Sequence, residues 1–236
     1  QNSYDGPINA CLHGDIDLLH ITEPPAYMAI PCSNAAAILT RTAEHAGYAI
    51  FLTTHSHTYI RETTLLPRLI SHHASHHGRL HVFLFRGEDD IHTAILGLYA
   101  FQRAHTNHTK ATPDKQLSPS HLKTTVFNLI TDLKTKYPPL RLFLLGDFQH
   151  IIIDNTLHRM GKMLDPPRAD LLKPCLVSPH HLVSIIPTQH PTTVYHTWFS
   201  KTGGGRAGLD HILGARSDIP DDSSSGIDHE IANAYL

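Results

Sequence analysis

The pattern of apolar and polar positions is most informative in residues 141–149, where an apolar run ends abruptly in Gly-Asp-Phe-Gln. A strand that is covered on both faces need not alternate apolar and polar residues, so this run predicts a central strand. Gly146 allows a tight turn at the carboxyl end of the strand, and Asp147 and Gln149 then face outward. These two residues are therefore the first candidates for chemistry. The alternative is a strand that simply closes in an Asx-type turn.

The same pattern predicts further strands and a long helix. Residues 79–85 and 91–100 are expected to form a hairpin around residues 86–90. Ser118-Pro119-Ser120 opens a helix that runs to about Lys136, with Val126, Leu129, Ile130 and Leu133 on one face. Other strands are expected over residues 15–22, 46–53, 181–187, 193–200 and 209–213 and from residue 227, with a second helix near 169–177 and a long polar loop over 103–119. No internal repeat or linker is evident, so residues 1–236 are expected to form a single domain.

Composition narrows the class of protein. The chain has 236 residues, a hydrophobic content of 41%, a charged content of 17% and a formal net charge of −2. These values suit a globular domain, and no apolar run approaches the ~18 residues of a membrane span, so no membrane partner is expected. The net charge gives no bulk attraction for nucleic acid, which would have to be bound by a local patch or through metal ions.

Two residue types give weaker signals. Cys11, Cys32 and Cys175 are far apart and form no Cys-x-x-Cys pair, so a reducing intracellular compartment is the default expectation. The chain has 22 histidines, and His72 with His76, or His73 with His77, has the spacing of two metal ligands on one helical turn. The alternative is a polar loop of solvated histidines, which we favour for the stretch 55–78.

Collecting the polar residues at the expected strand ends gives a set that is ordered along the chain. The segments are Thr22-Glu23-Pro24, Ala46-Gly47-Tyr48-Ala49-Ile50, Leu98-Tyr99-Ala100-Phe101-Gln102, Gly146-Asp147-Phe148-Gln149, Thr197-Trp198, Leu209-Asp210-His211-Ile212 and Ile227-Asp228-His229. In this order they resemble the endonuclease/exonuclease/phosphatase (DNase I-like) superfamily, and within it the apurinic/apyrimidinic-type endonuclease domain of non-LTR retrotransposons. Each segment alone is a weak signal, whereas seven in order are hard to obtain by accident.

The resemblance implies an α/β fold, a four-layer α/β sandwich in which two packed, mostly antiparallel β-sheets are flanked by helices. It implies an Mg²⁺-dependent endonuclease, with Mn²⁺ as an alternative ion, that nicks double-stranded DNA and leaves a 3′ hydroxyl. That hydroxyl would prime reverse transcription by an attached reverse transcriptase domain, the chain being a fragment of a larger retrotransposon polyprotein that acts in the nucleus.

Roles for single residues also follow from the resemblance. Glu23 would be the main metal ligand and Asp228 a second one. Asp147 would activate the attacking water, with Gln149 beside it, and His229 paired with Asp210 would contact the scissile phosphate. Tyr99 would complete the catalytic group by a hydrogen bond to the phosphate. Binding of the substrate would fall to Asn2, Gln102, Thr197 and Trp198.

Three positions depart from the family pattern and keep other hypotheses open. Gln102 and Gln149 stand where the family has asparagines, and Ile227 stands where it has a serine. A longer amide shifts its contact by about an ångström, and such a displacement can cost a large factor in rate. One alternative is therefore a catalytically impaired pseudo-nuclease that acts as a DNA- or protein-binding module. Another is a phosphatase of the same fold that acts on a small phosphorylated substrate.

Overall fold

In the computed structural model the described residues are 16–22, 37–40, 47–87, 89–101, 119–149, 159–160, 180–190, 196–199 and 206–219. The strands are β1 (Leu18–Thr22), β2 (Ala37–Thr40), β3 (Tyr48–Leu52), β4 (Ser56–Arg61), β5 (Leu69–Ser75), β6 (Leu80–Arg86), β7 (His92–Tyr99), β8 (Leu140–Asp147), β9 (Arg159–Met160), β10 (Leu182–Ser184), β11 (Trp198–Phe199), β12 (Arg206–Ala207) and β13 (Asp210–Ala215). The α-helices are α2 (Pro119–Lys136) and α4 (Ile185–Gln189), and short 3₁₀ turns are η2 (Leu66–Arg68), η3 (His76–Gly78) and η7 (Arg216–Asp218).

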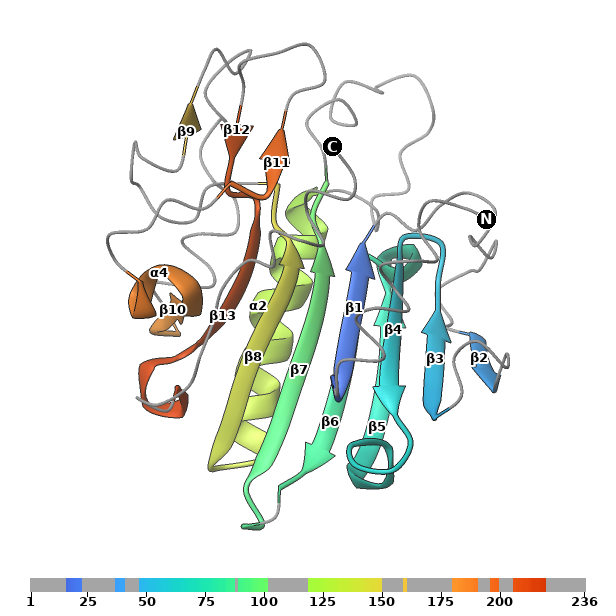
Figure 1. Cartoon of the computed structure of the whole chain (residues 1–236). Coiled ribbons are helices and arrows are strands. Elements are labelled where there is room, and N and C mark those ends of the chain that lie inside the picture. The colour runs from blue at the N-terminus through green and yellow to red at the C-terminus, as the bar shows by residue number, and fades with distance from the viewer. Residues whose placement is uncertain are drawn as a thin grey trace.

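Two main sheets and one small one organise the described residues (Figure 1). The four-stranded sheet has the order β1-β4-β3-β2, and the six-stranded sheet has the order β10-β13-β8-β7-β6-β5. Neighbouring strands are antiparallel except β7 and β8, which are parallel. The pairing of β7 with β8 is parallel because α2 connects them as a crossover. The small sheet has the order β11-β12-β9.

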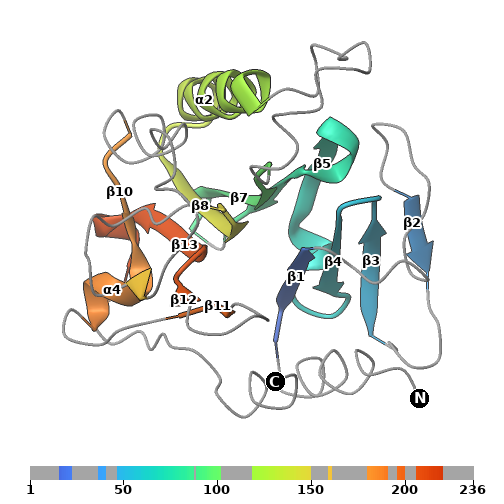
Figure 2. The same cartoon turned by 90° about the horizontal axis from the view of Figure 1, so that it is seen from above.

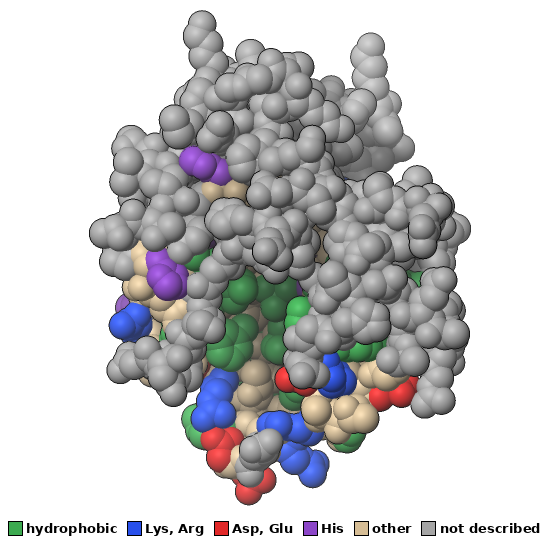
Figure 3. Space-filling model, in the orientation of Figure 1, with side chains coloured by type: hydrophobic (Ala, Val, Ile, Leu, Met, Phe, Trp, Pro, Cys, Tyr) green, Lys and Arg blue, Asp and Glu red, His purple; other side chains and the backbone are tan. Residues whose placement is uncertain are grey.

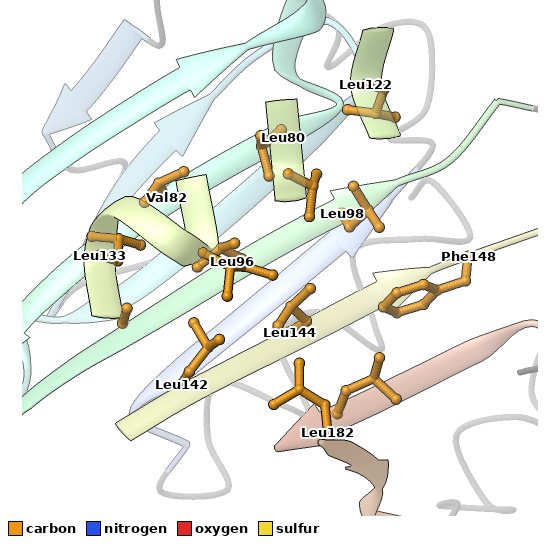
Figure 4. Close-up of a cluster of buried hydrophobic side chains, with 14 of the residues drawn as sticks. Leu80, Val82, Leu96, Leu98, Leu122, Leu133, Leu142, Leu144, Phe148 and Leu182 are labelled. Atoms are coloured by element: carbon orange, nitrogen blue, oxygen red, sulfur yellow. The ribbon is translucent and has the colours of Figure 1, made fainter. Parts of the chain in front are cut away.

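The core of the six-stranded sheet lies beneath α2, which covers one face of that sheet (Figure 2). From the helix, Leu122, Val126, Ile130 and Leu133 are buried at helical spacing. They pack against alternate residues of β6, β7 and β8. Figure 4 shows Leu80, Leu96 and Leu144 of these strands beneath Leu122 and Leu133 of the helix. The amphipathic pattern of residues 118–136 therefore predicted both the helix and its buried face.

The other face of the six-stranded sheet is covered by the four-stranded sheet. Phe51 and Ile60 from the smaller sheet pack against Phe83 and Phe85 of β6. Strand β1 lies against β7 and β8, and Figure 1 shows that these three strands end at the same side of the molecule. Two packed sheets with a helix on the outer face make the α/β sandwich of the DNase I-like fold.

Most strands expected from the sequence are confirmed, with boundaries shifted by a few residues. The hairpin β6–β7, the central strand β8 and the strand β13 lie where they were expected. Residues 181–187 were expected to be one strand, and this is wrong after Ser184, where α4 begins. The expected helix at 169–177, most of the loop at 103–119 and the strand from 227 lie outside the described residues.

The histidine-rich stretch 55–78 is not a solvated loop. It forms β4 and β5 joined through η2, and it closes in η3. Because His72 lies in a strand, its i, i+4 spacing with His76 does not place both rings on one helical face. None of the helices in the described ranges is long and apolar enough to span a membrane.

Candidate active site

Three of the expected site residues are neighbours across the six-stranded sheet. Tyr99, at the end of β7, is paired with Asp147 at the end of β8. Asp147 is paired in turn with Asp210, the first residue of β13. Residues paired in adjacent strands have their Cβ atoms about 5 Å apart. A phenol and two carboxyl groups therefore form one row at the carboxyl end of the only parallel strand pair described, β7 and β8.

The row faces away from α2. Leu98 and Leu144 belong to the core beneath that helix. Successive side chains of a strand alternate between the two faces, so Tyr99 and Asp147, an odd number of positions away, point to the opposite face. Asp210 shares the face of its partner Asp147 and is exposed. The row thus lies on the face of the six-stranded sheet that β1 covers. It is at the same side of the molecule as Thr22, the last residue of β1, after which the chain continues to Glu23.

The turn after β8 is built by Gly146 and Phe148. Gly146 has φ +134°, and a Cβ atom there would lie 2.0 Å from the carbonyl oxygen of Leu98. Only glycine fits this close approach of β7 and β8. Phe148 is fully buried, packs at the end of the α2 core (Figure 4), and donates its N–H to the carbonyl of Leu209 at 2.9 Å. The segment Gly-Asp-Phe-Gln is therefore anchored on both sides of Asp147.

The carboxyl group of Asp147 is held by Gln149. The backbone N–H of Gln149 donates to Oδ1 at 2.7 Å, and its side-chain amide donates to Oδ2. This is the Asx-type turn that the sequence allowed, and here it orients a carboxyl group within the row. Gln149 has φ +53°, a left-handed conformation that residues other than glycine, asparagine and aspartate rarely adopt. Such strain at a candidate site has a cost and is kept only where the surroundings fix it.

Thr197 fixes the start of β13. Its Oγ1 accepts hydrogen bonds from the backbone N–H groups of Leu209 and Asp210, both at 3.0 Å. The side chain thereby satisfies two donors and sets the position from which Asp210 projects. For Trp198, the structure describes the backbone in β11.

Two residues near Tyr99 were not identified from the sequence. The guanidinium of Arg79 lies over the Tyr99 ring, at 4.6 Å from its centroid. The ring of His55 is tilted by 41° against that of Tyr99, with centroids 6.0 Å apart. Both residues come from the histidine-rich stretch, or directly after it. The available signal was an arginine immediately before an apolar strand, in a hairpin whose other arm ends in Tyr99.

Other expected site residues lie outside the described residues. They are Asn2, Glu23, Gln102, Asp228 and His229, so the expected pairing of His229 with Asp210 stays a prediction. His211, next to Asp210, is not in the row. Its ring contacts Phe148 edge-to-face and Nε2 lies 3.1 Å from the carbonyl of Gly208, which is a structural arrangement on the α2 side.

The described part of the chain contains no group of three or more histidine, cysteine, aspartate or glutamate side chains that could hold a metal ion. The row contributes two carboxyl groups, of Asp147 and Asp210, and carboxylate oxygens are the donors that Mg²⁺ prefers. Mg²⁺ keeps several water ligands, so one or two further carboxylates are sufficient. The donor chemistry of the row therefore fits a hard divalent cation.

Buried and half-buried histidines form a separate group between the sheets. His20 Nδ1 lies 2.8 Å from Thr58 Oγ1, and His72 Nε2 lies 3.4 Å from His81 Nδ1. Burial, followed by the charges of neighbouring histidines, lowers the pKa of His81 to about 2 and those of His20 and His72 to about 4. These rings are neutral at pH 7, and they belong to the packing of the two sheets.

Sequence comparisons give no assignment. No model of a known protein family matches the chain, and no curated protein matches it.

Solved structures are similar to it over nearly its whole length. D. rerio TDP2, complexed with a single-strand DNA product, has a TM-score of 0.52 at 12% identity, with 93% of this chain and 81% of that chain covered. The endonuclease domain of TRAS1, a telomere-specific non-LTR retrotransposon, has a TM-score of 0.50 at 13% identity, with 89% and 78% covered. The human Nocturnin catalytic domain has a TM-score of 0.53 at 12% identity, with 91% and 75% covered.

A 3′ phosphatase from Neisseria bound to a product DNA hairpin, NExo, is similar to the same degree, with a TM-score of 0.50 at 14% identity. At these identities the four structures establish the architecture. Together with the two packed sheets, they show that this chain has the DNase I-like fold.

Proposed function

We propose that the protein is a metal-dependent endonuclease that nicks double-stranded DNA by phosphodiester hydrolysis and leaves a 3′ hydroxyl. The observation that carries this proposal is the row of Tyr99, Asp147 and Asp210 in adjacent strands at one end of the six-stranded sheet. Solved structures of the same fold support it, because they include an endonuclease domain and proteins crystallised with product DNA.

Asp147 is the residue to which we assign activation of water. A carboxylate accepts the proton of the attacking water as the oxygen–phosphorus bond forms, and the 3′ oxygen leaves as the bond to phosphorus breaks. Gln149 binds both oxygens of this carboxyl group through its backbone and side-chain N–H groups, which fixes the orientation of Asp147.

Asp210 is assigned His229 as its partner. We propose that its carboxylate pairs with His229 and holds that imidazole in its charged form beside the scissile phosphate. The exposure of Asp210 at the first position of β13 leaves it accessible for this contact. Thr197, which was expected to hold the substrate, is assigned the positioning of Asp210, because its oxygen already accepts two backbone N–H groups.

Glu23 and Asp228 are assigned as ligands of Mg²⁺, with Mn²⁺ as an alternative ion. When bound, this ion would neutralise charge on the phosphate and on the leaving 3′ oxygen. Tyr99 would donate its hydroxyl to a phosphate oxygen, and Asn2, Gln102 and Trp198 would contact the DNA backbone. We further propose that the 3′ hydroxyl primes reverse transcription by an attached domain, in a nuclear retrotransposon polyprotein of which this chain is a part.

Side chains of both charges lie at the end of the six-stranded sheet opposite the row. The end of the six-stranded sheet opposite the row carries an ion pair, with Arg141 Nη2 at 2.8 Å from Asp89 Oδ2. Figure 3 shows acidic and basic side chains together at the lower end of the molecule, where the β6–β7 hairpin lies in Figure 1. In the described part of that end the two signs lie side by side, which weakens the attraction for a DNA backbone there.

The test is to incubate the protein with supercoiled plasmid in Mg²⁺ and in EDTA, and then to offer the product to a DNA polymerase. Metal-dependent nicks that the polymerase extends support the endonuclease with its 3′ hydroxyl product. Release of inorganic phosphate from a 3′-phosphorylated oligonucleotide, with intact plasmid, would instead identify a phosphatase. Salt-dependent DNA binding with no cleavage in Mg²⁺ or Mn²⁺ would identify a non-catalytic binding module.

A further inference from the structure

Arg79 is a buried cation beside the candidate site. Its side chain is 6% exposed, and its guanidinium carbon lies 4.6 Å from the ring centroid of Tyr99 and 4.2 Å from that of Phe101. A guanidinium at this distance from two aromatic faces is attracted by both, and the attraction is larger when the cation is desolvated. The arginine thus lies between the rings on either side of Ala100.

The backbone of the same segment is also bound by Arg79. Its Nη1 donates to the carbonyl of Ala100 at 3.3 Å, and its own carbonyl accepts the N–H of Tyr99 at 2.8 Å. The N–H of Ala100 donates to the carbonyl of Asp147 at 2.8 Å. The side chain and the backbone carbonyl of Arg79 together therefore hold residues 99–101, and that segment is in turn bonded to the strand end that carries Asp147.

We propose that Arg79 is a positioning residue for phosphodiester recognition, and that it acts through Tyr99; this inference rests on the proposed function. The guanidinium holds the Tyr99 ring in place at the end of β7. Its positive charge over the ring face also polarises the phenolic O–H and makes it a stronger donor to an anionic phosphate oxygen. Arg79 itself does not touch the substrate in this account.

Arginine is suited to this position for two reasons. Its planar group can stack on two rings and still donate N–H groups in its own plane, which lysine cannot do. Its charge is permanent, so the cation persists in a buried site, and a lysine offers a cation without the planar stack. Arg79→Lys should therefore retain part of the effect, and Arg79→Met, of similar size and without charge, should lose it.

The chain offers a matched control for a cation over a tyrosine ring. Arg61 lies over Tyr48 at 5.3 Å from the ring centroid, and its Nη2 donates to the Tyr48 hydroxyl at 2.8 Å. Arg61 is at the end of β4 away from Ser56, which pairs with Thr22 at the site end of β1. Arg61→Met removes the same kind of contact far from the row, so it should leave nicking unchanged.

The closing experiment combines two readouts. The first is NMR of protein labelled at the tyrosine Cζ carbon, with the Tyr99 resonance assigned by its absence in Tyr99→Phe. Arg79→Met should shift the Tyr99 resonance and leave that of Tyr48 unchanged, and Arg61→Met should do the reverse. The second is a double-mutant cycle in the nicking assay. Arg79→Met should reduce kcat by about ten- to hundredfold in the wild-type background, and by much less in the Tyr99→Phe background, since the hydroxyl is then absent.

An unmoved Tyr99 resonance would overturn the inference. An equal loss of kcat in both backgrounds would also overturn it, because replacing a merely structural arginine lowers kcat by the same factor with or without the Tyr99 hydroxyl. Partial recovery in Arg79→Lys supports it. A wild-type protein that nicks no DNA overturns the proposed function, and the NMR readout then decides by itself whether Arg79 positions Tyr99.

Discussion

The hydroxyl oxygen of Thr197 accepts the backbone N–H of Asp210 at 3.0 Å, which ties the small sheet to the first residue of β13. Asp210 is the third member of the row formed with Asp147 and Tyr99. A residue that the sequence suggested as a contact for DNA is thus used to place a carboxyl group.

Thr197→Val removes the acceptor and retains the shape of the side chain. Two N–H groups, of Leu209 and Asp210, then lose their partner, and we expect a loss of about 1–3 kcal/mol in the free energy of unfolding. Nicking should fall as well, because Asp210 is no longer fixed. Thr197→Ser keeps the oxygen and should behave as the wild type in urea unfolding. Equal stability of the valine and serine variants would show that these hydrogen bonds contribute nothing.

Gln149→Asn should relieve backbone strain. Glutamine at φ +53° is held in a region that asparagine tolerates better, so we expect a gain of up to about 1 kcal/mol in unfolding free energy. The shorter amide matches the family pattern at this position, and nicking should rise. Gln149→Ala keeps the strain and loses the bond to Asp147 Oδ2, so its nicking should fall. The prediction fails if asparagine lowers both stability and nicking.

Gly146→Ala should be severely destabilising. The new Cβ would lie 2.0 Å from the Leu98 carbonyl at φ +134°, so steric overlap is added to a backbone strain of about 1–3 kcal/mol. Gly47→Ala is the control, since Gly47 has φ +91° and an added methyl group there would meet nothing within 4 Å. Thermal unfolding should show a far larger decrease for the Gly146 variant than for the Gly47 variant. Similar decreases would mean that β7 and β8 can separate at little cost.

The hydrogen bonds around His81 favour one tautomer of its ring. With Thr53 Oγ1 donating to the carbonyl of Ser56 at 2.8 Å, His81 Nε2, at 3.2 Å, is placed to donate to that hydroxyl oxygen. Nδ1 of His81 is then an acceptor, and it receives the Nε2–H of His72. Protonation of His81 places a second hydrogen between these two rings, so an added proton disrupts the arrangement.

Stability should therefore fall in mild acid. The folded-state pKa values of His81 and His20, about 2 and about 4, are below the ordinary value of 6.5, so the unfolded chain binds more protons between those values and 6.5. The full contribution of these neutral rings to the free energy of unfolding is present above pH 6.5. As the pH falls below 6.5, each ring lowers that free energy by on the order of 1 kcal/mol per pH unit. His81→Gln keeps a donor and an acceptor and cannot be charged, so its acid-unfolding midpoint should lie at lower pH. His73→Gln, at an exposed position on the same strand as His72, should leave the midpoint unchanged; a shift of equal size would assign the effect to surface charge.

Sequence reasoning found the elements whose pattern is local. The apolar face of α2, the hairpin and the central strand each appear within a short window, and the order of strand-end residues gave the fold. Strands β4 and β5 were not predicted, because their histidines are polar residues and yet some of them pack between the two sheets. Burial of His81, like that of Arg79, depends on partners far along the chain, so no local pattern predicts it.

The role of Thr197 could not be predicted for the same reason. Its partners are Leu209 and Asp210, more than ten positions away, and a threonine at a strand end is equally compatible with contact to a ligand. Similarly, the sequence shows Gln149 only as a glutamine where the family pattern has an asparagine. Its hydrogen bonds to both oxygens of Asp147 depend on the left-handed backbone at Gln149, which the sequence does not reveal.

The most direct test of the account compares Asp147→Asn with Asp132→Asn in Mg²⁺-dependent nicking of supercoiled plasmid. The amide that replaces the Asp147 carboxylate could not accept a proton from water, whereas Asp132 is exposed on α2, on the other face of the sheet. We expect the first variant to lose nicking by about a hundredfold or more while remaining folded, and the second to nick as the wild type does. Undiminished nicking by Asp147→Asn would contradict the account.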